Sequence, residues 1–355
     1  MTKRLRDVTA LGVVILLCLV LASPVGAAEF QEGRLRLTLH EDVGRFSISY
    51  LRDLRREDYV PLFYAQDPRT SVISVTDGEQ VHRLGDAGVF TLRTETEGDS
   101  PAFLFRSSSL EVRQRFTFVS SPNARLANGV RMDLTITNTS ERSADVGVRV
   151  LLDTHLSENR GEHFAVAGGR AIGSETALEP GASTPYWTSM SDRYEDVGLQ
   201  YMLSGSSVTV PERVVFANWK RLSDSRYDYT TRSGRSFSLL PYSINDSAVA
   251  VYYSQETVGP GASRTITTYL GNYDEAGFGD AGRQSDLAGM LDSENVGEEP
   301  ATEDALLQEL VAVDDVMEEI DRLLANPEEA SSEDIELINR LLDQLEARKD
   351  AISDQ

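Results

Sequence analysis

The polar run that begins at Asp153 holds the side chains best suited to chemistry in this sequence. It combines acids, an amide and a cation with two of the four histidines of the chain: Asp153, His155, Glu158, Asn159, Arg160, Glu162 and His163. Two histidines beside carboxylates are the residue types of a divalent metal site or of an acid–base pair. Their spacing matches no zinc motif, so we expect no metal and no cofactor. The candidate catalytic residues are Asp153, His155, Glu158 and His163, and a solvated surface loop is the competing interpretation.

Two aromatic segments offer surfaces on which a sugar ring can stack. The first, PYWTSMSDRYED, places Trp187 close to three carboxylates at positions 192, 195 and 196. The second surrounds Trp219 and extends to Tyr242. We take Trp187, Trp219 and Tyr242 as candidate ligand-binding residues. Aromatic side chains in the core of a β-sheet protein produce the same pattern, and that interpretation stays open.

Alternating apolar residues predict the strands that position the polar run. Residues 130–136 alternate between apolar and polar side chains, and residues 144–152 repeat the pattern. Period-two alternation is typical of strands that have one face on a core. The turn-forming residues 138–143 between the two runs predict an antiparallel hairpin. Leu151 and Leu152 break the alternation, which indicates burial on both faces where the second strand ends.

Further strand-like runs extend over residues 29–273 without intervening amphipathic helices. Examples are LRLTL at 35–39, RFSISYL at 45–51 and LEVRQRFTFV at 110–119, each bounded by glycine, aspartate or proline. Strands of this length separated by turn residues are typical of antiparallel sandwiches. The sequence therefore predicts a mainly β protein whose residues 29–273 form one large antiparallel β-sandwich.

The N-terminal residues 1–28 have the composition of a signal peptide. Lys3, Arg4 and Arg6 precede an apolar run at 10–22, and the small residues of PVGAA follow. This arrangement directs export, so we expect a periplasmic or extracellular protein with no membrane span after cleavage. The only cysteine, Cys18, lies inside this segment. The mature chain therefore has no disulfide and no cysteine chemistry.

The C-terminal part of the chain differs from the rest in composition. Residues 274–300 are rich in glycine and acids and predict a flexible linker. Residues 301–355 carry apolar side chains at helical spacing and predict an acidic helical hairpin with a break at Asn326-Pro327. The two helices pack on each other, on the sandwich, on a partner, or on a second copy in a homo-oligomer. A net charge of −23 excludes nucleic acid as a partner, because nucleic-acid binding requires a basic surface.

The run ITNTSERSADVGVRVLLDT, followed by LEPGASTPYW, resembles exported bacterial β-sandwich domains. These include the supersandwich of galactose-mutarotase-like and carbohydrate-associated proteins. The resemblance covers about the middle third of the chain and implies a supersandwich-like fold. The acid histidine and base glutamate of the mutarotase family have no matching motif in this sequence, so the resemblance assigns no catalytic residue.

These observations lead to two hypotheses of different classes. Because no catalytic constellation is recognisable, the leading hypothesis is a non-catalytic structural or binding protein of the bacterial envelope. Its sandwich would bind an envelope protein or a glycan surface, and its helical hairpin would engage a partner. The alternative is a carbohydrate-active enzyme, similar to a sugar epimerase or hydrolase, that uses the loop from Asp153 to His163.

Overall fold

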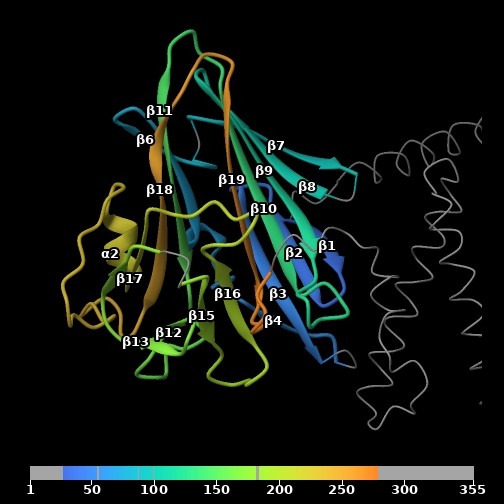
Figure 1. Cartoon of the computed structure of the whole chain (residues 1–355), viewed down its shortest axis with the longest axis vertical. Coiled ribbons are helices and arrows are strands. Elements are labelled where there is room, and N and C mark those ends of the chain that lie inside the picture. The colour runs from blue at the N-terminus through green and yellow to red at the C-terminus, as the bar shows by residue number, and fades with distance from the viewer. Residues whose placement is uncertain (1–26, 54–55, 87, 99, 181–183, 279–355) are drawn as a thin grey trace, which may run out of the picture.

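The computed structural model describes residues 27–53, 56–86, 88–98, 100–180 and 184–278. These residues form antiparallel sheets, as predicted, so the chain is mainly β (Figure 1). Within the described residues the helical elements are the α-helix α2 (Trp219–Asp224) and the 3-10 helix η1 (Pro68–Thr70). The predicted signal peptide up to residue 26, most of the predicted linker and the predicted helical hairpin at 301–355 lie outside the described residues.

The described strands make three sheets. The four-stranded sheet has the order β1-β2-β3-β4 and consists of β1 (Ala27–Glu32), β2 (Leu35–His40), β3 (Arg45–Asp53) and β4 (Asp58–Pro61). The six-stranded sheet has the order β14-β17-β18-β11-β5-β6 and consists of β5 (Val72–Asp77), β6 (Gln80–Arg83), β11 (Ala144–Asp153), β14 (Thr176–Leu178), β17 (Arg213–Asn218) and β18 (Ser247–Val258).

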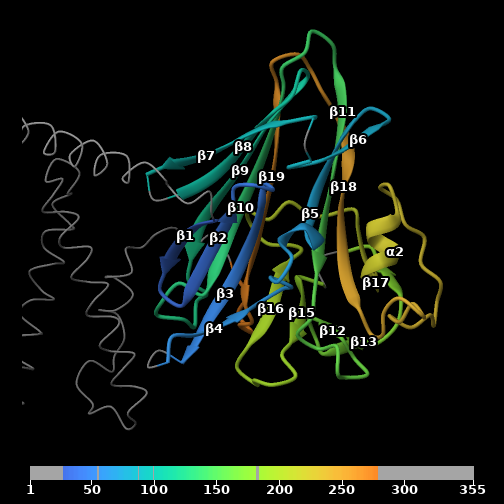
Figure 2. The ribbon, with the colours of Figure 1, turned by 180° about the vertical axis from the view of Figure 1, so that it is seen from behind.

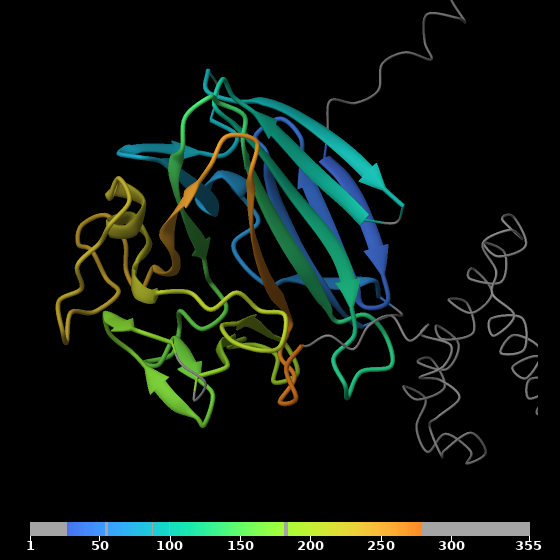
Figure 3. The same cartoon turned by 45° about the horizontal axis from the view of Figure 1, so that its top comes forward.

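The nine-stranded sheet is the largest, with the order β13-β12-β15-β16-β19-β10-β9-β8-β7. Its strands are β7 (Thr91–Glu97), β8 (Ser100–Arg106), β9 (Leu110–Val119), β10 (Gly129–Asn138), β12 (Phe164–Val166), β13 (Arg170–Ile172), β15 (Tyr186–Met190), β16 (Gly198–Met202) and β19 (Ser263–Asn272). The four-stranded sheet packs on the part of this sheet that contains β7 to β10 (Figure 3). Phe46 of β3 meets Phe116 of β9 there, with ring centroids 4.8 Å apart.

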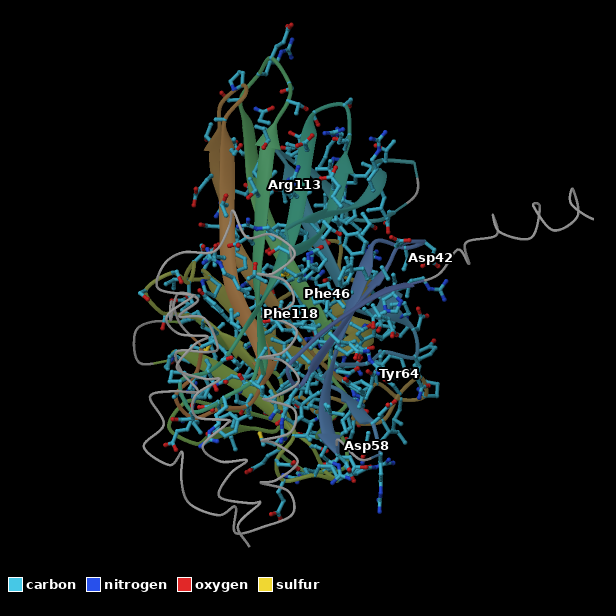
Figure 4. The ribbon with its side chains drawn as sticks, turned by 90° about the vertical axis from the view of Figure 1, so that its right-hand side faces the viewer. Asp42, Phe46, Asp58, Tyr64, Arg113 and Phe118 are labelled. Atoms are coloured by element: carbon cyan, nitrogen blue, oxygen red, sulfur yellow. The ribbon has the colours of Figure 1, made fainter. Side chains whose placement is uncertain are left out.

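One continuous hydrophobic core joins the three sheets. It includes Leu37 of β2, Phe116 of β9 and Val150 of β11. Phe46 and Phe118 mark its position between two of the sheets (Figure 4). A second, smaller cluster lies where α2 covers the six-stranded sheet, and it includes Leu151. Leu151 and Leu152 are thus both buried, in different clusters, as their break in alternation predicted.

The predicted hairpin of residues 130–152 is wrong in its pairing. β10 pairs with β9 and β19 in the nine-stranded sheet, whereas β11 pairs with β5 and β18 in the six-stranded sheet. The turn between β10 and β11 therefore crosses from one layer to the other. Asn138 holds this corner, because its side-chain amide donates to the carbonyl oxygens of Arg142 at 2.7 Å and of Val258 at 2.8 Å. Period-two alternation specifies one buried face and does not specify which strand lies alongside.

Candidate functional site

Four neighbouring strands of the six-stranded sheet have their ends side by side along one border of the sheet, which we call the sheet edge. β11 ends at Asp153, which is opposite Ala248 near the start of β18, and β17 ends at Asn218, opposite Ser247. β5 begins at Val72, opposite Leu151. The antiparallel arrangement thus brings the polar residues just outside these strands to one place (Figure 2). We call residues 153–163, which leave this edge, the acidic loop.

Asp153 is held in place mainly by its backbone. Its N–H donates to the Ser71 hydroxyl at 2.9 Å, and its carbonyl oxygen accepts from the Tyr64 N–H at 2.8 Å. Tyr64 lies on the segment that follows β4 (Figure 4). The residue as a whole is only 7% exposed. The carboxyl group is therefore removed from water by the segments that precede β5.

Burial raises the pKa of the Asp153 carboxyl to about 8, and a hydrogen bond from Thr70 opposes that rise. The carboxylates of Asp246, Glu158 and Asp67 add to it, because neighbouring negative charges disfavour ionisation. A carboxyl group in this state keeps its proton at neutral pH. It can then act as a proton donor.

Glu158 reaches back from the acidic loop to the same sheet edge. Its Oε1 accepts a hydrogen bond from the Ser247 N–H at 3.1 Å, at the start of β18. Burial raises the pKa of Glu158 to about 7, the Ser247 N–H opposes the rise, and the carboxylates of Asp246 and Asp192 add to it. Glu158 is therefore partly ionised at neutral pH and can accept a proton.

Asp246 is a third carboxylate of this group that the sequence analysis missed. Its backbone carbonyl accepts from the Asn218 side chain at 2.9 Å and from the Trp219 N–H at 3.0 Å. Burial raises the pKa of its carboxyl, and a hydrogen bond from Ser243 opposes the rise. We call Asp153, Glu158 and Asp246 the carboxyl cluster. No local motif connects Asp246 to the acidic loop, because sheet pairing alone brings the two segments together.

The two candidate histidines have separate surroundings. The His155 ring lies against Tyr64, with centroids 6.2 Å apart, and the His163 ring packs on Phe237 at 4.7 Å. Burial lowers the pKa of both imidazoles; the Arg193 charge adds to this at His155, and the Asp192 carboxylate opposes it at His163. Both rings are therefore neutral at neutral pH. The structure does not bring them together into a single acid–base or metal-binding pair.

The acidic loop also borders an open hollow of about 370 Å³. Arg160, Glu162 and His163 line it from the loop, and Thr188 and Met190 line it from β15. Asp192 belongs to this region as well, since its carboxylate pairs with the Arg160 guanidinium at 2.9 Å and accepts from the Asn159 side chain at 3.0 Å. The volume lies at the lower end of the range for small-molecule sites.

The three aromatic candidates differ in exposure. Trp187 is completely buried and stacks on Tyr201 with ring centroids 5.8 Å apart, so it belongs to the core. Trp219 begins α2, and its indole N–H donates to the Thr70 carbonyl at 2.9 Å, next to the carboxyl cluster. Tyr242 is 71% exposed and lies 5.8 Å from the Lys220 ammonium. Trp219 therefore lies beside the carboxyl cluster and Tyr242 lies beside α2, whereas Trp187 is unable to stack on a ligand.

Another buried carboxylate, Glu175, has different partners. Its side chain is fully buried and pairs with the Arg221 guanidinium at 2.9 Å and with that of Arg235 at 2.8 Å. The Tyr229 hydroxyl and the Arg232 N–H complete its hydrogen bonds. Burial acts to raise the pKa of Glu175, but these partners together lower it.

In the described part of the chain, no group of three or more His, Cys, Asp or Glu side chains is arranged to hold a metal ion. Among the same residues, no helix is both long and apolar enough to cross a bilayer.

The described residues form a mainly β architecture of antiparallel sheets. Structures similar to this chain include a galactose mutarotase related enzyme from Lactobacillus acidophilus, with 8% identity, a TM-score of 0.45, and coverage of 70% of this chain and 98% of the other. A galactose mutarotase-like protein from Lactobacillus casei has 10% identity, a TM-score of 0.45, and coverage of 70% and 100%. An aldose epimerase homologue from C. elegans has 10% identity, a TM-score of 0.44, and coverage of 70% and 99%. No protein-family model and no curated protein matches the sequence.

These comparisons correct the leading hypothesis from the sequence. The similar structures bear the titles of mutarotase-related and aldose epimerase proteins, and these titles do not support a non-catalytic structural or binding protein. They agree better with the carbohydrate-active alternative. At these identities the likeness concerns the fold and assigns no chemistry to the side chains of this chain.

Proposed function

We propose that this chain is a carbohydrate-active enzyme that performs acid–base chemistry with the acidic loop. One observation carries the proposal. Asp153 is a buried carboxyl and Glu158 a neighbouring half-buried one, and their pKa values are raised to about 8 and about 7, so one is protonated and the other partly ionised at neutral pH. Carboxyls whose pKa values lie near the working pH are typical of general acids and bases.

The roles follow from these protonation states. Protonated Asp153 donates its proton to an acetal oxygen of the sugar, which weakens the bond between that oxygen and the anomeric carbon. Ionised Glu158 accepts a proton from the anomeric hydroxyl or from an attacking water. Loss of the proton from the anomeric hydroxyl opens the sugar ring, and reclosure of the ring completes an epimerase reaction. Loss of a proton from the attacking water, which adds to the anomeric carbon, completes a hydrolase reaction. Both reactions use the same two carboxyls.

The side chains next to the loop support a sugar as substrate. The hollow presents a guanidinium from Arg160, a carboxylate from Glu162 and a hydroxyl from Thr188 beside the apolar Met190. Sugars present hydroxyls along their edges and C–H groups on their faces, so they need such a mixture of polar and apolar contacts. Trp219, half-buried at the sheet edge, adds an aromatic surface beside the carboxyl cluster.

The experiment compares two variants in the acidic loop with a control variant at the far end of β11. Mutarotation of glucose and galactose is followed by polarimetry, and cleavage of oligosaccharides is followed by release of reducing ends. We expect Asp153→Asn and Glu158→Gln each to lower the rate by about 10² to 10⁴-fold, the usual contribution of a general acid or base. The control is Asp145→Asn, at the exposed start of β11, which should keep full activity. An inactive wild type, or an active Asp153→Asn variant, would contradict the proposal.

The activity should also depend on pH in a bell shape. The rate rises as Glu158 ionises near pH 7 and falls as Asp153 loses its proton near pH 8. Because the two carboxyls interact, the two limbs belong to the pair and not to either residue alone. A pH–rate profile of the wild-type enzyme measures both limbs. A flat profile between pH 5 and pH 9 would rule out this assignment.

We also propose that the enzyme acts in the periplasm or outside the cell. The support is the N-terminal sequence, in which basic residues at 3, 4 and 6 precede the apolar run 10–22. Cell fractionation with N-terminal sequencing of the mature chain tests this. Recovery of an intact N-terminus in the cytoplasmic fraction would contradict it.

A further inference from the structure

A guanidinium group is completely buried beneath α2. Arg149 of β11 is only 1% exposed, and its Nη2 donates to the carbonyl oxygen of Leu222 on α2 at 2.8 Å. At this place α2 packs on the six-stranded sheet (Figure 2). Burial of a charged side chain costs free energy unless an opposite charge lies close to it. Arg149 therefore needs a counter-charge in its surroundings.

Among the described residues, no carboxylate pairs with Arg149. Burial lowers the pKa of its guanidinium, the Tyr252 hydroxyl opposes this effect, and the positive charge of Arg83 adds to it. Arg83 donates to the Ser223 carbonyl oxygen at 2.8 Å and also has no carboxylate partner among the described residues. Two guanidinium groups thus meet the end of α2 without compensation of their charge.

The acids of α2 and of the loop that follows it have other partners. Asp228 pairs with Arg213 at 3.0 Å, and its side chain is 82% exposed. Asp224 pairs with Lys220 at 2.8 Å, and its side chain is 62% exposed. Both acids therefore compensate cations that are themselves partly exposed, and the buried charge of Arg149 is left without an anion.

Two buried polar atoms near this charge have no hydrogen-bond partner within the described structure. They are Nε of Arg149 and the hydroxyl oxygen of Tyr227. Both side chains pack on Tyr252, whose ring centre lies 5.6 Å from the Arg149 guanidinium carbon and 5.8 Å from the Tyr227 ring centre. Burial raises the pKa of the Tyr227 hydroxyl, and the Arg149 charge opposes the rise. Buried polar atoms are nearly always hydrogen-bonded, so two such atoms indicate a bound water or ion.

The backbone of β11 allows the Tyr227 hydroxyl to lie on the same face of the strand as Arg149. A side-chain carbon at Gly147 would be only 3.1 Å from that hydroxyl, so a glycine permits its close approach. Gly147 and Arg149 are alternate residues of one strand, which share a face and lie about 7 Å apart. The hydroxyl and the guanidinium are therefore near enough for one small ligand to contact both.

We propose that a small monovalent anion of the size of chloride binds between Nε of Arg149 and the Tyr227 hydroxyl. A water molecule completes the hydrogen bonds of both groups but leaves the guanidinium charge uncompensated, whereas an anion does both. A sulfate or phosphate brings two charges and four oxygens into a buried place with only two unpartnered donors. The two donors therefore favour an anion of a single atom.

The anion would join three parts of the fold. Arg149 belongs to β11 and contacts Leu222 of α2, and Tyr227 belongs to the loop that follows α2. Trp219, beside the carboxyl cluster, is at the opposite end of α2. The anion would thus stabilise the packing of α2 on the sheet. The proposal does not depend on the carbohydrate chemistry of the carboxyl cluster.

Urea unfolding of the full chain at several chloride concentrations tests the site, with methanesulfonate replacing chloride at constant ionic strength. An ion that binds only the folded state lowers the unfolding equilibrium constant about tenfold for each tenfold rise in its concentration above the dissociation constant. We expect this dependence in the wild type and its loss in Arg149→Met. The matched control Arg213→Met removes the guanidinium that lies 4.5 Å from the same Tyr252 ring, and it should keep the dependence. Wild-type stability that is independent of chloride, or an equal dependence in Arg149→Met, would overturn the proposal.

A crystal structure with bromide in place of chloride provides a second readout, which holds even if Arg149→Met does not fold. We expect an anomalous bromide peak in contact with Nε of Arg149 and the Tyr227 hydroxyl. Tyr227→Phe removes one of the two donors and should weaken halide binding by about tenfold in the unfolding experiment. The lack of an anomalous peak at these atoms would show that water occupies the place, and the proposal then fails.

Discussion

Two buried carboxylates in this molecule, Glu175 and Asp153, differ in what surrounds them. Glu175 is enclosed by the guanidinium groups of Arg221 and Arg235, and its pKa is lowered. The charges that act most strongly on Asp153 are other carboxylates, and its pKa is raised to about 8. Burial opposes ionisation at both positions, so the partners decide the outcome.

The comparison separates a structural role from a chemical one. A buried carboxylate with two cations stays ionised and joins the segments that hold its partners, here the segment before β14 to α2 and the loop that follows α2. A buried carboxyl with only anionic neighbours costs stability when it ionises and stores a proton near neutral pH. We therefore assign Glu175 to the fold and Asp153 to the proposed chemistry.

The largest expected effect concerns Asp153 and the pH dependence of stability. Between about pH 4 and pH 8 the folded protein keeps the Asp153 proton while the unfolded chain has lost it, so the free energy of unfolding falls as pH rises. A pKa raised by about four units corresponds to at most about 5 kcal/mol over this range. Asp153→Asn lacks this titration, so it should be more stable than the wild type at pH 8 and equal to it at pH 4. Urea unfolding at both pH values measures the difference, and equal stability at pH 8 would contradict the account.

A smaller effect of opposite sign is expected at Glu175. Glu175→Gln keeps the shape of the side chain but leaves Arg221 and Arg235 without their counter-charge. Because these guanidinium-bearing side chains are 14% and 28% exposed, water partly compensates, and we expect a loss of about 2–3 kcal/mol at pH 7. For the wild type, this contribution is present above the ordinary pKa of a glutamate and is lost as pH falls through the lowered pKa. Denaturant unfolding at pH 7 and pH 3 checks both statements, and a variant as stable as the wild type at pH 7 would argue against a structural role.

The smallest effect is expected at an exposed ion pair. Lys220 and Asp224 are 2.8 Å apart on α2, with side chains 37% and 62% exposed. Solvent screens such pairs, so Asp224→Asn should change the free energy of unfolding by less than about 0.5 kcal/mol. The same urea titration at pH 7 provides the measurement. A loss as large as that of Glu175→Gln would show that burial is not what distinguishes these carboxylates.

The strands were predictable from the sequence because alternation reports burial directly. Val130 to Ile136 and Ala144 to Leu152 are strands, as their patterns indicate. Their assignment to one hairpin failed, because the residues that form a corner between layers resemble those of a tight turn. Only the pairing of β10 with β19 and of β11 with β18, whose partners lie 95 or more residues apart in the sequence, decides the topology.

The site was predictable only in part, for a similar reason. The acidic loop was found because its polar residues are adjacent in the sequence. Asp246 was missed because it reaches the carboxyl cluster through the pairing of β18 with β11, and no local pattern reports that contact. Trp187 was selected for its residue type, but composition does not distinguish a tryptophan that stacks on Tyr201 in the core from one that faces water.

The most direct test of the account is the pKa of Asp153 itself. The protein is labelled with ¹³C at the aspartate carboxyl carbons, and chemical shifts are followed from pH 3 to pH 10, with Asp153→Asn identifying the resonance. We expect the Asp153 carboxyl to titrate near pH 8, about four units above an ordinary aspartate. A midpoint near pH 4 would show that the carboxyl is ionised at neutral pH. In that case Asp153 is unable to donate the proton, and the proposed acid–base chemistry fails.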